Sequence, residues 1–170
     1  MNETLAAWNA AGAMEARNAM LACCGAKRWA DAMVALRPIA SVFALSKEAD
    51  RVWSTVQEAD WLEAFACHPR IGERRVSAHV GAQSSAWSKA EQTQTNSASD
   101  RVLADIAEGN QRYEEQFGFT YIVCATGKSA EEMLAILERR LKSTREAELR
   151  EAAEQQRQIM QIRLGKWLIE

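Results

Sequence analysis

The chain has 170 residues, 48% of them hydrophobic and 26% charged, a composition typical of a globular protein that argues against a disordered one. Its formal net charge of −2 gives no general attraction to nucleic acid or to a membrane, and no apolar run approaches the roughly 20 residues that span a bilayer. Because no basic and apolar leader precedes the chain and no peroxisomal address ends it, we expect a cytoplasmic protein.

Apolar residues recur at three- and four-residue spacing up to His68, which predicts helices there. The first helices are expected over Leu5–Ala11, Met14–Cys24 and Trp29–Leu36, with a fourth beginning at Ser46. Asp60 and Glu63 have the spacing of a capping box that opens a fifth helix. Pro69 ends that helix, because the residue before a proline disfavours the helical conformation. His68 is therefore expected at a helix C-terminus.

The stretch from Ile71 to Ser88 contains glycines, serines and few large apolar residues, and we expect a long loop there. Ser88 and Glu91 have capping-box spacing, which predicts a helix running towards Asn96. The remaining helices are expected over Ser99–Gly118, from the capping box Ser129–Glu132 onwards, and over Thr144–Trp167.

Phe119–Ala125 is the one run with a strand-like composition, and it is too short and too isolated to build a sheet. We expect it to be a buried, extended connection between helices. The predicted fold is therefore all-α: one compact domain over residues 1–170, a bundle of about eight helices with one short extended segment.

His68 is one of only two histidines, and Pro69 follows it directly. At a helix C-terminus the negative end of the helix dipole favours a protonated imidazole, which suits a group that gives up a proton near neutral pH. A histidine that merely caps the last carbonyl groups of the helix explains the same position, so the residue alone leaves both interpretations open.

Polar residues at unusual positions mark further candidates. Glu91 and Gln92 place a carboxylate beside an amide, a pair that can bind a polar ring, although Glu91 also fits a capping box. Arg163 lies on the apolar stripe of the last helix, where its charge requires a partner: Glu91, backbone carbonyl groups or a substrate carboxylate. Asn110 lies on another apolar stripe, and the extended segment is its expected hydrogen-bond partner.

Other common sites are not indicated by the sequence. Gly127-Lys128-Ser129 lacks the glycine that a phosphate-binding loop carries five residues earlier, where Ile122 stands, and a turn before a capped helix explains it. The four cysteines form no Cys-x-x-Cys pair, so they are expected to be free and mostly buried. Histidines and acidic residues show no metal-ligand spacing, and no metal is expected.

The order of several motifs resembles one family. His68-Pro-Arg-Ile-Gly72 comes first, followed by Glu91-Gln92, by Asn110-x-x-Tyr113-x-x-x-Phe117-Gly118 and by Cys124-Ala-Thr-Gly-Lys-Ser-Ala130. Together with Trp29-Ala30, Arg37-Pro38, Asp60–Phe65 and Arg163-Leu164, these runs are similar to the 2-oxo-4-hydroxy-4-carboxy-5-ureidoimidazoline (OHCU) decarboxylases over nearly the whole chain.

The resemblance implies a compact all-helical fold, a homodimer, and catalysis without a cofactor or a metal. The implied substrate is the small molecule OHCU, which loses its carboxylate as carbon dioxide to give (S)-allantoin, the third step from urate to allantoin. By the same resemblance His68 is the proton donor and Glu91 a second catalytic residue. The implied substrate-binding residues are Pro69, Ser88, Gln92, Phe119, Thr120, Tyr121, Ile122, Val123 and Arg163.

Two other functions remain open on the sequence. A non-catalytic, dimerising helical scaffold explains the bundle, but not a core-facing Arg163, a histidine-proline helix end and a Glu-Gln pair in one small chain. A metal-free hydrolase of cyclic ureides needs a base that activates water, and Glu91 alone is a weak candidate for that base.

Overall fold

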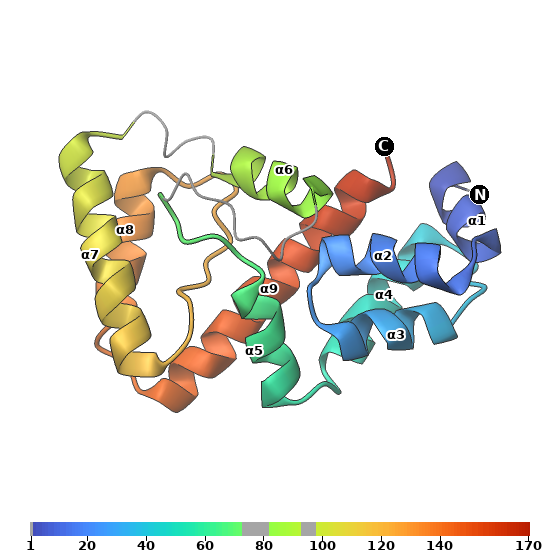
Figure 1. Ribbon diagram of the computed structural model, residues 1–170, viewed down its shortest axis with the longest axis horizontal. Coiled ribbons are helices and arrows are strands. Elements are labelled where there is room, and N and C mark those ends of the chain that lie inside the picture. Colours follow the sequence, from blue (N-terminus) through green and yellow to red (C-terminus); the bar gives the residue numbers. More distant parts are fainter. Residues whose placement is uncertain (1, 73–81, 93–97) are drawn as a thin grey trace. The chain divides into compact units, whose positions relative to one another are not determined.

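The computed structural model describes residues 2–72, 82–92 and 98–170, and over these ranges it consists of helices and loops (Figure 1). The helices are α1 (Glu3–Ala10), α2 (Ala13–Cys23), α3 (Lys27–Ala35), α4 (Val42–Trp53), α5 (Glu58–Ala66), α6 (Ala82–Glu91), α7 (Asp100–Phe117), α8 (Ala130–Arg140) and α9 (Arg145–Trp167). The prediction of an all-α fold is confirmed. None of these helices combines the length and the apolar character that crossing a membrane requires.

The chain divides into two compact units. Unit 1 contains Met1–Ala64 and Arg157–Glu170, and unit 2 contains Phe65–Gln156. Helix α9 therefore contributes its first part to unit 2 and its last part to unit 1. That residues 1–170 form a single domain stays a prediction.

In unit 1 consecutive helices pack against one another, α1 with α2, α2 with α3 and α3 with α4. Two buried tryptophans join them, because the Trp8 indole N–H donates to the Ala16 carbonyl at 2.9 Å and that of Trp29 donates to the Ala49 carbonyl at 3.1 Å. On α9, Gln161 donates to the carbonyl of Ser46 at 3.0 Å and so connects the end of the chain to α4. Such pairing satisfies polar groups that burial would otherwise leave unpaired.

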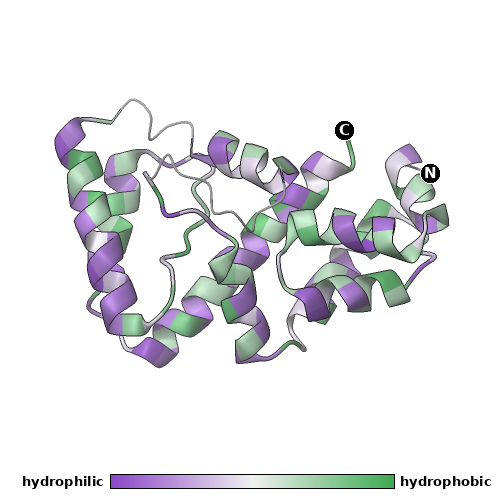
Figure 2. Ribbon diagram, in the orientation of Figure 1, coloured by the Kyte–Doolittle hydropathy of each residue, from purple (hydrophilic) through white to green (hydrophobic). Residues whose placement is uncertain are grey.

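Unit 2 contains the pair α7 and α8, which lie side by side (Figure 1). Gly109 permits their close approach, since a Cβ atom at that position would lie 2.5 Å from Cδ2 of Leu137. Hydrophobic and hydrophilic residues alternate along the helices (Figure 2), as expected where each helix buries one face. Between α7 and α8 runs the predicted extended segment, Phe119–Ala125, whose residues are buried except for the half-buried Thr120.

Local capping signals placed three helix ends correctly. Ser99 caps α7 by accepting from the Val102 N–H, and Gly118 ends α7 in the left-handed conformation with φ 81°. Ser129 and Glu132 form the predicted capping box at the start of α8. The predicted turn before that capped helix is confirmed, and Gly127 lies in it with φ 79°.

Three predicted helix starts are wrong. Helix α4 begins at Val42 and not at Ser46, because Ser41 caps it. Helix α5 begins at Glu58, so the Asp60 carboxylate reaches back from inside the first turn to accept from the Gln57 N–H at 2.8 Å.

The third error concerns the expected loop from Ile71 to Ser88. Its last part is helical, because α6 begins at Ala82. Ser88 is consequently buried inside that helix with 3% exposure and does not cap it. The rest of the expected loop, which includes the second histidine, His79, and the predicted continuation of the helix to Asn96 lie outside the described residues.

Candidate active site

His68 lies directly after α5, as predicted. Its backbone N–H donates to the Phe65 carbonyl at 3.1 Å and closes the final turn, and its side chain is half-buried. The ring nitrogen Nε2 is 2.7 Å from Oε1 of Gln156, a fully buried side chain of α9 that lies 88 residues further along the chain. The imidazole is thus held by a side-chain amide from another helix.

Helix α7 holds the turn that follows His68 and Pro69. The Arg70 guanidinium forms a two-pronged pair with the Glu114 carboxylate, with both N–O distances 2.7 Å. Asn110 donates to the Ile71 carbonyl at 3.1 Å. The prediction that Asn110 bonds the extended segment is therefore wrong, although its role as a buried hydrogen-bonding residue of α7 is confirmed.

The end of α6 lies against the same turn. Gln92 accepts through Oε1 from the Gly72 N–H at 3.2 Å, where Gly72 has φ 81°, a conformation that favours glycine. Glu91 is the last residue of α6, so the alternative that it serves a capping box is wrong. A carboxylate at a helix C-terminus faces the negative end of the dipole, which costs stability. The helix dipole therefore gives no reason for a carboxylate at this position.

The extended segment offers backbone donors. Among the described residues, no acceptor is paired with the backbone N–H of Phe119, Thr120, Tyr121, Ile122 or Val123. Buried peptide N–H groups are nearly always hydrogen-bonded in folded proteins. A row of such groups that have no acceptor in the described part of the chain is what a segment that binds a ligand through its backbone requires.

Both ends of this segment are fixed near His68. The Phe119 ring packs against Phe65 at the end of α5, with ring centroids 5.5 Å apart. At the other end, the Cys124 N–H donates to Oε1 of Gln155 at 2.8 Å. Since Gln155 precedes the residue that holds the His68 ring, two consecutive glutamines of α9 anchor the segment and the imidazole to one helix turn.

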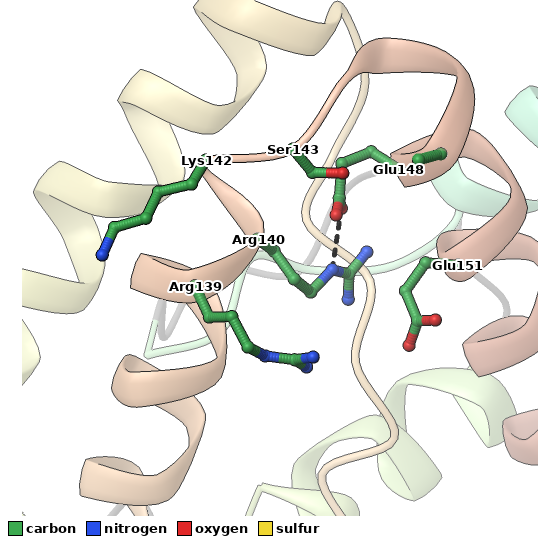
Figure 3. Close-up of a pocket in the computed structure, with 7 residues that line it drawn as sticks. Arg139, Arg140, Lys142, Ser143, Glu148 and Glu151 are labelled. Atoms are coloured by element: carbon green, nitrogen blue, oxygen red, sulfur yellow. Dashed lines mark hydrogen bonds and ion pairs between the residues drawn. The ribbon is translucent and has the colours of Figure 1, made fainter.

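A buried ion pair supports the middle of the segment. Arg140 of α8 and Glu148 of α9 lie 2.7 Å apart and are 2% and 3% exposed (Figure 3). Arg140 also donates to the Ile122 carbonyl at 2.5 Å, and Tyr113 donates to Glu148 at 2.7 Å. A cavity of about 320 Å³ opens beside this pair, lined by residues of α8, α9 and the turn between them.

Tyr113 and Arg140 of this network keep their ordinary protonation states. Burial raises the pKa of the Tyr113 hydroxyl far above its ordinary value, and its bond to Glu148 adds to that shift. Burial alone would lower the pKa of Arg140, but the charge and the hydrogen bond of the Glu148 carboxylate oppose that effect, and the pKa is raised overall. Tyr113 therefore stays a neutral donor and Arg140 a cation, and the backbone at Ile122 keeps its partner over the pH range of a folded protein.

Arg163 belongs to unit 1 and is buried, with 3% exposure, as its place on an apolar stripe predicted. It lies near Cys23, whose thiol pKa is raised by burial and only partly lowered by the guanidinium charge. That thiol stays protonated and unreactive. The expectation of free, mostly buried thiols is confirmed, since Cys23, Cys24 and Cys124 are buried and Cys67 is half-buried.

The sequence missed the groups that hold the candidate site. Gln156 and Arg140 stand on apolar stripes of their helices, and a polar residue at such a position was the available signal. Nothing in the local sequence named their partners. Within the described ranges no three histidine, cysteine or acidic residues are grouped to hold a metal ion.

A model of the OHCU decarboxylase family matches residues 9–165. The chain belongs to the OHCU decarboxylase family. A crystal structure of an OHCU decarboxylase in the presence of (S)-allantoin superposes with a TM-score of 0.76 and 30% identity, covering 88% of this chain and 96% of that one.

Two curated relatives agree with this membership. The uric acid degradation bifunctional protein TTL of Arabidopsis thaliana is 36% identical over 85% of this chain. The chain spans 44% of the length of that plant protein. The 2-oxo-4-hydroxy-4-carboxy-5-ureidoimidazoline decarboxylase of Haloferax volcanii is 26% identical, covering 76% of this chain and 74% of the relative. In this member of the OHCU decarboxylase family, the histidine-proline turn follows α5 and the extended segment connects α7 to α8.

Proposed function

We propose that this chain decarboxylates OHCU to (S)-allantoin, the third step from urate to allantoin. The observation that carries the proposal is the row of backbone N–H groups from Phe119 to Val123. These groups have no acceptor among the described residues, and the segment is anchored to the same turn of α9 as His68. Family membership supports it, as does the solved relative that was crystallised with (S)-allantoin.

The chemistry makes three demands. When the bond between the ring carbon and the carboxylate breaks, its electron pair stays on the ring carbon and delocalises into the adjacent imine or carbonyl, and carbon dioxide leaves. The site must hold the carboxylate, stabilise the developing charge, and add a proton to one face of that carbon.

The proposed roles follow from these demands. His68 supplies the proton, and delivery from one side gives a single enantiomer. The backbone N–H groups of Phe119, Thr120, Tyr121, Ile122 and Val123 donate to the ring oxygens. Pro69 lines the site, and Ser88 and Gln92 contact the polar edge of the substrate. Glu91 is the second catalytic residue and accepts from the substrate hydroxyl or ureido N–H. Arg163 holds the substrate's anionic carboxylate.

Circular dichroism on freshly generated OHCU tests the function directly. Purified protein is added to OHCU made from urate in place, and the (S)-allantoin signal is followed. We expect it to rise far faster than the slow spontaneous decay, which gives the racemate. Decay at the spontaneous rate in the presence of the folded protein would refute the proposal and return the scaffold and the hydrolase to consideration.

Glu91→Gln is expected to lower turnover about a hundredfold or more, the size of an acid–base contribution, with unfolding free energy unchanged within about 1 kcal/mol. Removing a carboxylate from the C-terminal end of α6 does not weaken that helix, because the dipole disfavours the charge there. Steady-state kinetics and thermal denaturation measure the two effects. Full turnover in this variant would remove Glu91 from the catalytic residues.

Arg163→Met is expected to raise the Michaelis constant for OHCU about tenfold to a hundredfold, since one charge-assisted contact is lost. The protein is expected to stay folded, because methionine fills the buried position of the long side chain. Arg157→Met is the matched control: this arginine of the same helix pairs with Asp50 at 3.1 Å, and its loss leaves the Michaelis constant unchanged. A large fall in melting temperature at an unchanged Michaelis constant would make Arg163 a structural residue.

The proposal extends to the assembly. By the family resemblance, the enzyme works as a cytoplasmic homodimer without cofactor or metal. Large exposed apolar side chains on unit 1, such as Phe43 with 72% exposure, give a surface that a second copy can cover. Light scattering on the purified protein measures the mass, and dialysis against a chelator leaves activity unchanged if no metal takes part.

A further inference from the structure

Gln156 contacts the His68 ring and has no role assigned to it so far. Its side chain is fully buried, with 0% exposure, and its Oε1 lies 2.7 Å from His68 Nε2. Its amide nitrogen Nε2 is also buried and, among the described residues, has no hydrogen-bond partner. Buried polar atoms are nearly always paired, so an unpaired amide next to this ring calls for an explanation.

The paired half of the amide determines where the hydrogen of the ring lies. A side-chain carbonyl oxygen only accepts hydrogen bonds, so the imidazole must present Nε2–H to Gln156. An imidazolium carries a hydrogen on each nitrogen, and with Nε2–H held by Gln156 the proton that leaves is the one on Nδ1. The ring is then left as the neutral Nε2–H tautomer, which is the form that Gln156 stabilises.

The unpaired half of the amide is suited to a ligand. It is a neutral NH₂ group attached to the same carbon as the oxygen that faces His68, so it lies within the immediate surroundings of the ring. The proposed substrate and product are cyclic ureides rich in carbonyl oxygens. One such oxygen placed beside His68 would satisfy the buried donor, which has no partner in the described part of the chain.

We propose that Gln156 has two roles, as the positioning residue of His68 and as a ligand contact. The amide oxygen of Gln156 fixes the His68 ring as the tautomer with hydrogen on its Nε2. The amide nitrogen of Gln156 donates to a carbonyl or carboxylate oxygen of the bound cyclic ureide. The inference rests on the proposed function of His68. In the protonation step the Nδ1–H bond breaks, the electron pair on the ring carbon forms the new C–H bond, and the imidazole becomes neutral.

Two substitutions separate the two halves of the amide. Gln156→Glu keeps an oxygen that accepts from Nε2–H but removes the NH₂ donor. Gln156→Met fills the buried space and removes both. Gln161→Met is the matched control. In the contacts described for it, this glutamine of the same helix forms hydrogen bonds with Ser46 and Asp50 of unit 1.

Nitrogen-15 NMR of the histidine rings measures the tautomer of His68, which would not change if Gln156 had only a structural role. The protein has only two histidines, and His79→Asn assigns the His68 signals. In the neutral ring we expect Nε2 protonated in the unsubstituted protein, in Gln156→Glu and in Gln161→Met, and a mixture of tautomers in Gln156→Met. Calorimetry with (S)-allantoin as the probe is expected to show binding about tenfold weaker in both Gln156 variants and unchanged in Gln161→Met.

The outcomes distinguish this inference from the proposed function. An unchanged His68 tautomer and unchanged (S)-allantoin affinity in Gln156→Met would reduce Gln156 to a core amide and overturn the inference. An Nδ1-protonated ring in the unsubstituted protein would overturn it as well. If OHCU turnover is absent while the Nε2–H tautomer and (S)-allantoin binding respond to Gln156 as expected, the proposed decarboxylation fails and the assignment of Gln156 stands.

Discussion

His68→Asn is expected to lower turnover of OHCU by about 10²–10⁴-fold, the usual range for loss of a general acid, while the protein stays folded. Asparagine is smaller than histidine and polar, so the half-buried position accepts it, although its amide is too short to reach Gln156 as the ring nitrogen Nε2 does. It has no group that gives up a proton near neutral pH. The backbone donors of the extended segment remain, so substrate binding is retained.

The product distinguishes this loss from a general defect. Because His68 is the proposed source of a proton on one face, the allantoin that still forms in the variant is expected to be racemic. Circular dichroism measures the enantiomer, absorbance measures the loss of OHCU, and calorimetry with (S)-allantoin shows that the site is intact. His79→Asn, at the only other histidine, is the control that keeps activity. Turnover within tenfold of the unsubstituted protein, with (S)-allantoin still the product, would exclude His68 as the proton donor.

The parts of the fold that the sequence predicted well depend on nearby residues. The Ser129–Glu132 capping box and the left-handed Gly118 act over one helical turn, so the residues that decide them lie within a few positions. The buried extended segment was equally visible, because a short apolar run without a partner strand has no other place than the interior. These elements also frame the candidate site.

The errors arose where several capping patterns compete. Ser88 and Glu91 match a capping box, but α6 begins at Ala82, so the apparent signal falls inside the helix. In the sequence Asp60 fits the N-cap position of a capping box. In the structure it is the third residue of α5, and its carboxylate accepts from the Gln57 N–H. A capping pattern indicates that a helix end is near, and packing determines at which residue the helix begins or ends.

In the candidate site, too, the sequence predicted local motifs but not contacts between distant residues. The histidine-proline turn and the backbone segment are visible as motifs, and a polar residue on an apolar stripe marks Gln156, Arg140 and Arg163 as residues that need partners. The partners themselves are set by the tertiary fold: His68 and Gln156 are 88 residues apart in sequence. Asn110 illustrates the limit, since its burial was foreseen but its partner, the Ile71 carbonyl, was not.

Arg140→Met is expected to lower the free energy of unfolding by about 3–5 kcal/mol, the cost of removing one member of a buried ion pair. The loss is large because Glu148, at 3% exposure, keeps a charge without its cation, and the Ile122 carbonyl loses its donor. Denaturant unfolding measures the change. Lys142→Met is the control: its side chain points away from the pair at the same cavity (Figure 3), and its loss is expected to change stability by less than about 0.5 kcal/mol.

Replacing both partners separates stability from positioning. In Arg140→Met with Glu148→Leu no buried charge is left unpaired, so we expect most of the lost stability to return, as apolar replacements of buried pairs often permit. Binding of OHCU is not expected to return, because the Ile122 carbonyl still lacks the donor that holds the segment from Phe119 to Val123 in place. The Michaelis constant should therefore stay raised in a variant that is stable. A double variant that regains both stability and the original Michaelis constant would show that the pair serves the core of unit 2 alone and that the backbone donors are positioned by Gln155 and the Phe65–Phe119 contact.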